Sequence, residues 1–101
     1  MRAADFEKMT EARLERTRKT LAAKATEYAD GNDRLHNFKM AAAMSRKTVR
    51  QALFGMLAKH LVSVVDMVES KEAFEVGYID EKVGDAINYL ILLEAVLIEN
   101  S

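Results

Sequence analysis

The hydrophobic and polar positions of this chain repeat with the period of an α-helix, and no segment alternates like a β-strand. The pattern predicts an all-α domain with three long helices and one short one, at about 5–29, 33–44, 49–69 and 80–99. A turn is predicted at 30–33, and Thr48 with Gln51 has the spacing of a capping box. Residues 70–79 lack a clear period and are predicted to be a connection of about ten residues.

The predicted helices at 49–69 and 80–99 are apolar around most of their circumference. Such helices must be covered on several sides, and the other two helices are too polar or too short to cover both. The missing surface most simply comes from another copy of the chain. We therefore expect a homodimer or homotetramer with these two helices at its centre.

Composition narrows the class of protein. With 101 residues, half of them hydrophobic, the chain is expected to form one domain over 1–101. It contains no cysteine, which excludes disulfides and thiolate metal sites. It shows neither a signal-peptide pattern nor an apolar run long enough to span a membrane, so we expect a soluble, cytoplasmic protein without a membrane partner.

The net charge of −1 conceals a strong asymmetry along the chain. Residues 34–65 contain six basic side chains and no acid, whereas residues 66–101 contain nine acids and two lysines. A site for a metal-bound phosphate ester would use both kinds of segment, with cations for the phosphates and carboxylates for the metal. Alternatively, the two segments simply neutralise each other across the fold.

Polar side chains form a line on each of the two apolar helices. On the last helix the line comprises Glu81, Asp85 and Asn88, and on the preceding helix it comprises Lys59, Ser63 and Asp66, with His60 at its edge. Antiparallel packing would bring the two lines together. Carboxylate oxygens are the ligands that Mg²⁺ or Mn²⁺ prefers.

Each of these features also has a purely structural interpretation. Glu81 and Asp85 could serve as N-terminal acids that favour the helix dipole, although this leaves Asn88 unexplained. His60 could be a packed histidine, and Tyr28 and Tyr89 are interpreted as core or interface residues. At the start of the short helix, His36, Asn37 and Lys39 could face a ligand or form a surface cap.

The segment Glu81-Lys82-Val83-Gly84-Asp85-Ala86-Ile87-Asn88-Tyr89-Leu90 resembles the second metal motif of the MazG-like all-α nucleoside triphosphate pyrophosphohydrolases. A broader pattern resembles a small phage and prophage group of MazG-related, nucleotide-modification-associated domains. Its parts are Tyr28 with Gly31, then Asp33-Arg34-Leu35-His36-Asn37-Phe38-Lys39, then Lys59-His60-Leu61-Val62-Ser63 with Asp66, and finally the Glu81 motif. The similarity covers about residues 24–98.

The resemblance implies an oligomeric four-helix fold in the cytoplasm of a bacterial host cell. It also implies Mg²⁺-dependent cleavage of a (deoxy)nucleoside triphosphate to a monophosphate and pyrophosphate. In such an enzyme the metal ligands would be Asp66, Glu81 and Asp85, and the water would be positioned or deprotonated by His60 or Glu69. Phosphates and substrate would contact Lys39, Arg46 and Lys59, together with His36, Asn37, Ser63 and Asn88.

Two departures from the family pattern keep other functions open. Lys59 and Lys82 stand where the hydrolases place acids. The second hypothesis is therefore a catalytically silent protein that binds a nucleotide or nucleotide signal, as a regulator or anti-defence protein would. The third is a helical protein-interaction module in which the polar lines pair with each other. Binding of nucleic acid is disfavoured by the overall charge.

Overall fold

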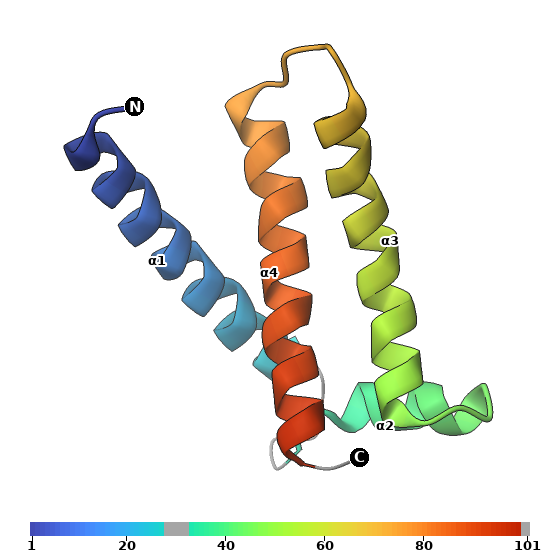
Figure 1. Ribbon diagram of the computed structural model, residues 1–101. Helices are drawn as coiled ribbons and strands as arrows, with labels where there is room; N and C mark the ends of the chain where they lie inside the picture. Colours follow the sequence, from blue (N-terminus) through green and yellow to red (C-terminus); the bar gives the residue numbers. More distant parts are fainter. Residues whose placement is uncertain (28–32, 100–101) are drawn as a thin grey trace.

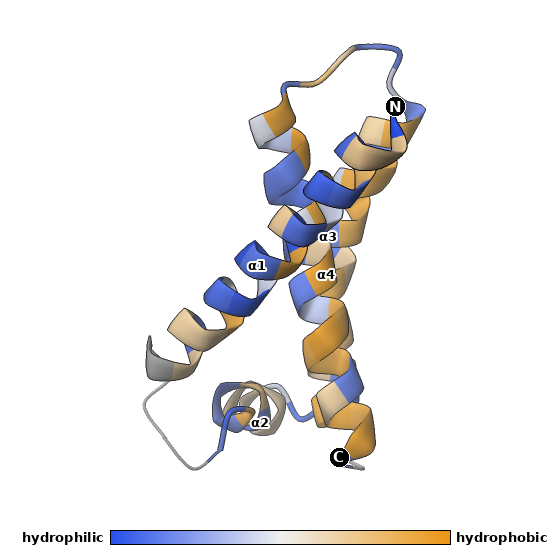
Figure 2. Ribbon diagram, turned by 90° about the vertical axis from the view of Figure 1, so that its left-hand side faces the viewer, coloured by the Kyte–Doolittle hydropathy of each residue, from blue (hydrophilic) through white to orange (hydrophobic). Residues whose placement is uncertain are grey.

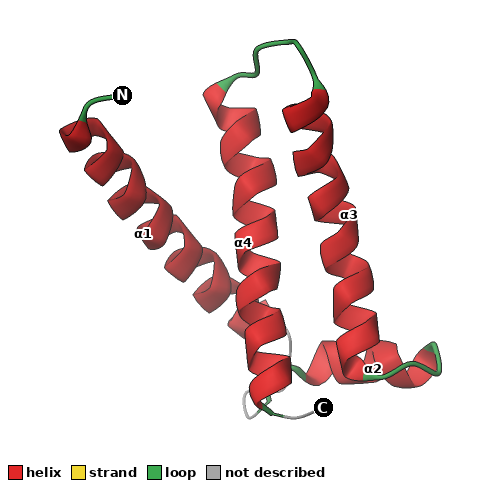
Figure 3. Ribbon diagram, viewed as in Figure 1, coloured by secondary structure: helices red, strands yellow, loops and turns green. Residues whose placement is uncertain are grey.

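The structure is a computed structural model that describes residues 1–27 and 33–99. Within these residues it contains four α-helices and no β-strand (Figures 1 and 3). The helices are α1 (Ala3–Glu27), α2 (His36–Met44), α3 (Val49–Glu69) and α4 (Val76–Ile98). The predicted all-α fold with three long helices and one short one is therefore confirmed.

Helices α3 and α4 form an antiparallel hairpin, with the short α2 lying across the end where α3 begins and α4 ends (Figure 1). Helix α1 crosses the hairpin obliquely on the side of α4 (Figures 1 and 2). The molecule is elongated, with principal extents of 45 × 28 × 22 Å. The antiparallel packing of α3 on α4 brings His60, at the edge of one predicted polar line, beside Asp85 of the other.

The capping box at the start of α3 is confirmed. The Thr48 hydroxyl accepts a hydrogen bond from the Gln51 backbone N–H at 3.1 Å, and the Gln51 side chain accepts one from the Thr48 N–H at 3.0 Å. Each bond satisfies a backbone donor that a helix start otherwise leaves unpaired. The two bonds fix the first residue of α3, and the helix runs over Val49–Glu69 as predicted.

Two predicted boundaries need correction. Helix α2 begins at His36 rather than at 33, because the carboxylate of Asp33 instead accepts the Leu35 N–H at 3.0 Å in the turn before the helix. Helix α4 begins at Val76 rather than at 80, so the connection is about half as long as predicted. The first turn of α4 lacks a helical period in the sequence because its apolar side chains are exposed to solvent. Residues 28–32, which include most of the predicted turn, Tyr28 and Gly31, lie outside the described part of the chain.

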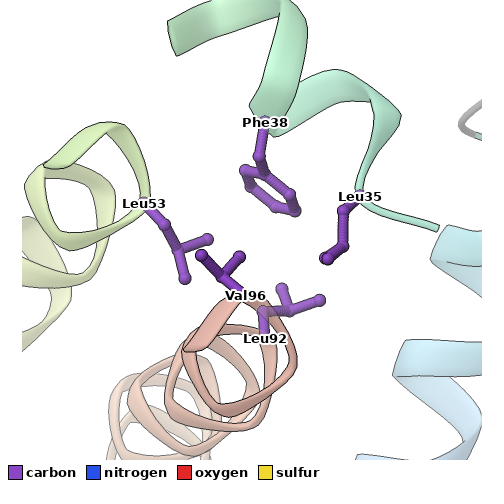
Figure 4. Packing of buried hydrophobic residues seen from close by; sticks show 5 residues of the cluster. All are labelled: Leu35, Phe38, Leu53, Leu92 and Val96. Atoms are coloured by element: carbon purple, nitrogen blue, oxygen red, sulfur yellow. The ribbon is translucent and has the colours of Figure 1, made fainter. Parts of the chain in front are cut away.

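The best-buried core lies where α2 crosses the hairpin (Figure 4). Its buried members, drawn from the turn before α2 and from α2, α3 and α4, are Leu35, Phe38, Leu53, Leu92 and Val96. Leu53 and Val96 have no exposed surface. This cluster joins α2 to the start of α3 and the end of α4 and fixes the positions of these helices.

Helix α1 is attached to α4 by ion pairs as well as by apolar contact. The carboxylate of Asp80 contacts the guanidinium groups of Arg13 at 2.5 Å and Arg16 at 2.6 Å. Arg13 also donates to the Asp80 carbonyl at 2.8 Å. Gly84 makes room for this arrangement, because an added Cβ there would lie 2.5 Å from Arg13 Nη1. Glycine in the motif around Asp85 therefore serves helix packing.

Candidate functional site

A cavity of about 190 Å³ lies between all four helices, directly beside the core. Its walls include Thr20, Leu21 and Lys24 from α1, Arg34 and Phe38 from the α2 region, His60 from α3, and Asp85, Asn88, Tyr89 and Leu92 from α4. Phe38 and Leu92 also belong to the core, so one wall of the cavity is held by buried side chains. Because every helix contributes, the cavity exists only in the folded chain.

Three predicted site residues, His60, Asp85 and Asn88, meet in this cavity. His60 Nδ1 lies 3.6 Å from Asp85 Oδ2, which is an ion pair when the imidazole is protonated. The imidazole stacks on the Tyr89 ring, with centroids 4.7 Å apart and planes inclined by 25°. The carboxylate and the phenol ring thus contact the imidazole from two directions.

Asn88 brings a polar group that the fold itself does not use. Its side-chain oxygen is buried, and no donor in the described part of the chain forms a hydrogen bond with it. Leaving a buried acceptor without a donor costs about 1–3 kcal/mol. A ligand that carries an N–H or O–H group would remove this cost when it enters the cavity.

The opposite wall of the cavity is cationic. Lys24 comes from the C-terminal part of α1, and Arg34 lies in the turn before α2. Together with Asp85 they give the cavity more positive than negative side chains while His60 is neutral. Positive charges beside a stacked aromatic ring and amide groups suit an anionic ligand that contains a ring.

The predicted metal ligands do not come together in the single chain. Among the residues that the structure describes, no three His, Asp or Glu side chains are close enough to hold a metal ion. Asp85 faces His60, Glu81 is exposed beside the ammonium group of Lys82 at 3.9 Å, and Asp66 is exposed on α3. The acids of one chain therefore do not fit a resident Mg²⁺.

The other predicted residues lie outside the cavity. Lys59 lines a separate groove of about 430 Å³ with Lys47 and Gln51, and Glu69 is exposed at the end of α3. Arg46 is exposed after α2 with a φ of 56°, a left-handed conformation that few non-glycine residues adopt. Three further predicted site residues are half-buried but do not line the cavity: His36, Asn37 and Ser63.

Lys39 has a structural role in the described chain. Its ammonium group contacts the Asp33 carboxylate at 2.8 Å and also the Glu99 carboxylate, which ties α2 to the end of α4. The hydrogen bond from Lys39, followed by that from the Leu35 N–H, lowers the pKa of Asp33 below its ordinary value of 3.8. The hydrogen bonds to Asp33 and then Glu99 raise the pKa of Lys39 above 10.5.

Sequence reasoning missed the contribution of α1 to the site. Thr20, Leu21 and Lys24 share one helix face, at the spacing that a ligand-facing side requires, but that helix looked like an ordinary amphipathic one. Tyr89 packs against the core beside Phe38, in line with its interpretation as a core or interface residue, and its ring also stacks on His60 in the cavity. The period of its helix could not show on which side His60 would pack.

The chain matches no protein-family model, and no curated protein or solved structure was found to match it.

Proposed function

We propose that this protein is a MazG-like nucleotide-binding protein and that the cavity between its four helices is the nucleotide site. The observation that carries the proposal is the meeting of His60, Asp85 and Asn88 in one cavity with a stacked tyrosine and two cations. Two of the three, Asp85 and Asn88, belong to the motif that resembles the pyrophosphohydrolases. The order of the helices and their antiparallel hairpin are compatible with such a fold.

Different walls of the cavity would contact different parts of a nucleotide. Lys24 and Arg34 would attract the phosphates, because charge-assisted hydrogen bonds to phosphate are stronger than hydrogen bonds between neutral groups. The buried oxygen of Asn88 would accept a hydrogen bond from the base or sugar. Tyr89 and His60 present a stacked aromatic surface beside them.

The size of the cavity indicates how much of a nucleotide it holds. A volume of about 190 Å³ is smaller than the ~300–1,000 Å³ typical of pockets for whole small molecules. An adjoining groove of about 570 Å³ shares Leu21, Arg34 and Leu92 with the cavity. A nucleotide would therefore enter the cavity with one part and extend past Arg34 with the rest.

Hydrolysis is the second candidate, and the His60–Asp85 pair is the observation that favours it. A histidine held by a carboxylate can accept a proton from water. The water oxygen would then attack the α-phosphorus of a nucleoside triphosphate, the bond to the β-phosphate would break, and pyrophosphate would leave. Any Mg²⁺ in this reaction would arrive with the triphosphate as part of the substrate.

Binding without hydrolysis is favoured by the distribution of charge. Glu81 faces Lys82 rather than Asp85, and cations can hold phosphates without a metal ion. A regulator or anti-defence protein that retains a nucleotide would need only the binding half of the site. Bound nucleotide and released pyrophosphate therefore have to be measured together.

The test is a panel of ribo- and deoxyribonucleoside triphosphates, each offered with and without Mg²⁺. Melting temperature reports binding, because a ligand that binds only the folded chain stabilises it. Pyrophosphate release reports turnover in the same samples. We expect at least one triphosphate to raise the melting temperature by several degrees.

Two matched substitutions locate the site. Asp85→Asn keeps the shape of the cavity but removes the carboxylate beside His60, so it should abolish any turnover, and it should strengthen binding of the anionic nucleotide because a negative charge is lost from the site. Glu81→Gln makes the same change one turn away on the exposed surface and should leave both unchanged. Equal losses of turnover in the two variants would instead support the metal set predicted from the sequence. No melting shift with any triphosphate would contradict nucleotide binding and favour an interaction module.

A further inference from the structure

The single chain exposes much more surface than a compact protein of its size. Its accessible surface is 7529 Å², whereas a compact monomer of 11.4 kDa exposes roughly 5,800 Å². Its radius of gyration is 15.6 Å, against about 13 Å for a compact domain of this length. The surplus of roughly 1,700 Å² exceeds the ~800 Å² that each partner buries in a standard interface.

Part of this surplus is an apolar stripe on α3, defined by Phe54, Leu61, Val62, Val65 and Val68. Phe54, Val62 and Val65 are between 54% and 58% exposed, and Val68 is 74% exposed. Their spacing places them on one flank of the helix, next to the side on which Leu53 and Leu57 pack into the chain. Aliphatic side chains in such a continuous exposed row are typical of an interface.

Helix α4 carries a matching apolar stripe on its outer face. Leu90 and Leu97 are 49% and 47% exposed, and with Leu93 and the exposed acid Glu94 they line a shallow groove of about 430 Å³. At about 100° of rotation per residue, the antiparallel pairing places both stripes on the same side of the hairpin. Together they form one apolar face that spans α3 and α4, named here the hairpin face.

Opposite charges stand at the two ends of the hairpin face. Arg46, Lys47 and Arg50 are exposed where α3 begins, at the end covered by α2 (Figure 1). The exposed acids Glu69, Glu72 and Glu75 surround the connection at the other end. The two groups are separated by most of the length of α3, which is about 30 Å for 21 residues.

We propose that a second copy of this chain covers the hairpin face in an antiparallel orientation, with α3 on α3 and α4 on α4. A twofold axis near Leu61 and Val62 would place the basic end of each copy against the acidic end of the other. The parallel alternative would place like charges together, which is unfavourable at close range. The apolar area supplies the affinity, and the charge distribution selects the orientation.

A lipid bilayer is the main competing occupant, because α3 is long and apolar enough to span a membrane by length and composition alone. Little of that segment is buried in the chain. However, Lys59 and Asp66 lie within the helix, and charged groups inside a bilayer are costly. A second copy would leave both at the edge of the interface, where water reaches them.

The first test measures molecular mass in solution by sedimentation across a range of concentrations. Wild type should be a dimer at micromolar concentration, and Val65→Glu should be a monomer, because it places a charge at the centre of the hairpin face. Leu14→Glu is the matched control, since Leu14 is 57% exposed on α1. Circular dichroism confirms that both variants remain helical. A monomeric wild type, or dissociation by Leu14→Glu alone, would overturn the proposal.

The second test determines the orientation and uses the absence of native cysteine. Val62→Cys should form a disulfide with its own copy, because the axis passes near this position. Phe54→Cys alone should not, since its two copies would lie about 20 Å apart along the helices, far beyond disulfide reach. A mixture of Phe54→Cys and Val68→Cys chains should form a mixed disulfide. Self-linking of Phe54→Cys, or failure of Val62→Cys to link, would contradict the antiparallel arrangement.

Charge reversal tests what selects this orientation. Arg50→Glu and Glu69→Arg should each weaken dimerisation by about five- to thirtyfold, as two exposed ion pairs are lost per dimer. The double variant exchanges the two charges and should recover most of the affinity. Wild-type affinity in both single variants would show that charge does not select the orientation. Binding of the wild type to neutral vesicles, in place of self-association, would identify the membrane as the occupant.

Discussion

The two ends of the hairpin differ in how completely they are folded. At the lower end in Figure 1, α2 closes over the start of α3 and the end of α4, and Leu53 and Val96 have no exposed surface. At the upper end, α1 meets α4 through the ion pairs of Arg13 and Arg16 with Asp80, and Val68 and Val76 remain 74% and 82% exposed. One chain therefore completes its core at one end only.

The difference indicates that ligand binding and assembly use different parts of the molecule. The cavity begins where the core ends, because Phe38 and Leu92 belong to both. The lower end can thus position His60, Asp85 and Asn88 within a single chain. The upper end offers apolar surface that has no use inside that chain. We infer that ligand binding depends mainly on the lower end and that assembly depends on the hairpin face.

The largest effect expected from a single substitution separates the two ends directly. Leu53→Ala leaves a cavity in the core and should lower the free energy of unfolding by about 2–5 kcal/mol. Val68→Ala removes an exposed side chain and should change it by less than about 0.5 kcal/mol at concentrations too low for association. Urea denaturation of both variants measures the difference. Similar losses would show that the upper end is packed as tightly as the lower one.

The starts of α3 and α4 offer a second comparison. Thr48→Ala removes the capping bond to Gln51 and should cost about 1 kcal/mol. Glu75 occupies the corresponding position before α4 but makes no side-chain capping bond. Glu75→Ala should therefore leave the urea midpoint unchanged. If Glu75→Ala lowered the free energy of unfolding as much as Thr48→Ala, the start of α4 would be capped as strongly as the start of α3.

Gly84 tests how α1 is held on α4. In an exposed helical position such as Gly55, alanine should stabilise the chain by about 0.5–1 kcal/mol. At Gly84 the same change should yield less, because the new Cβ displaces the Arg13 guanidinium from Asp80. In an Arg13→Ala background the full gain should return. A double-mutant cycle that shows no coupling between positions 13 and 84 would contradict the contact of Arg13 with Gly84.

The smallest effect concerns the ion pairs that join α2 to the end of α4. The lowered pKa of Asp33 means that its contribution is present above pH 3.8 and is lost as the pH falls through the lowered pKa. The raised pKa of Lys39 means that its contribution is present below pH 10.5 and is lost as the pH rises through the raised pKa. Stability curves of wild type and Lys39→Met should differ by a constant amount between these limits and converge outside them. Curves that stay parallel at all pH values would show that these contacts do not form. Added salt should reduce the difference in stability between wild type and Lys39→Met, because it screens the ion pairs.

The helices could be predicted from the sequence because their signals are local. The capping box specified the start of α3. The first turn of α4 was missed because the residues there are apolar on the exposed side, so the period that marks a packed helix is absent.

The site was predicted only in part, because it depends on rotations that sequence spacing does not fix. His60, Asp85 and Asn88 meet in the cavity, whereas Asp66 and Glu81 point elsewhere despite lying on the same predicted lines. Lys24 enters from the other end of the sequence, where no motif marked it.

The most direct test of the proposed site follows the two histidines of the chain by NMR. His60 lines the cavity and His36 does not, so one protein contains both the probe and its reference. A nucleoside triphosphate that raises the melting temperature is titrated into the wild type. We predict saturable shifts of the His60 imidazole signals, with much smaller changes at His36. Saturable shifts at His36 with an unchanged His60 would place the nucleotide elsewhere and contradict the account.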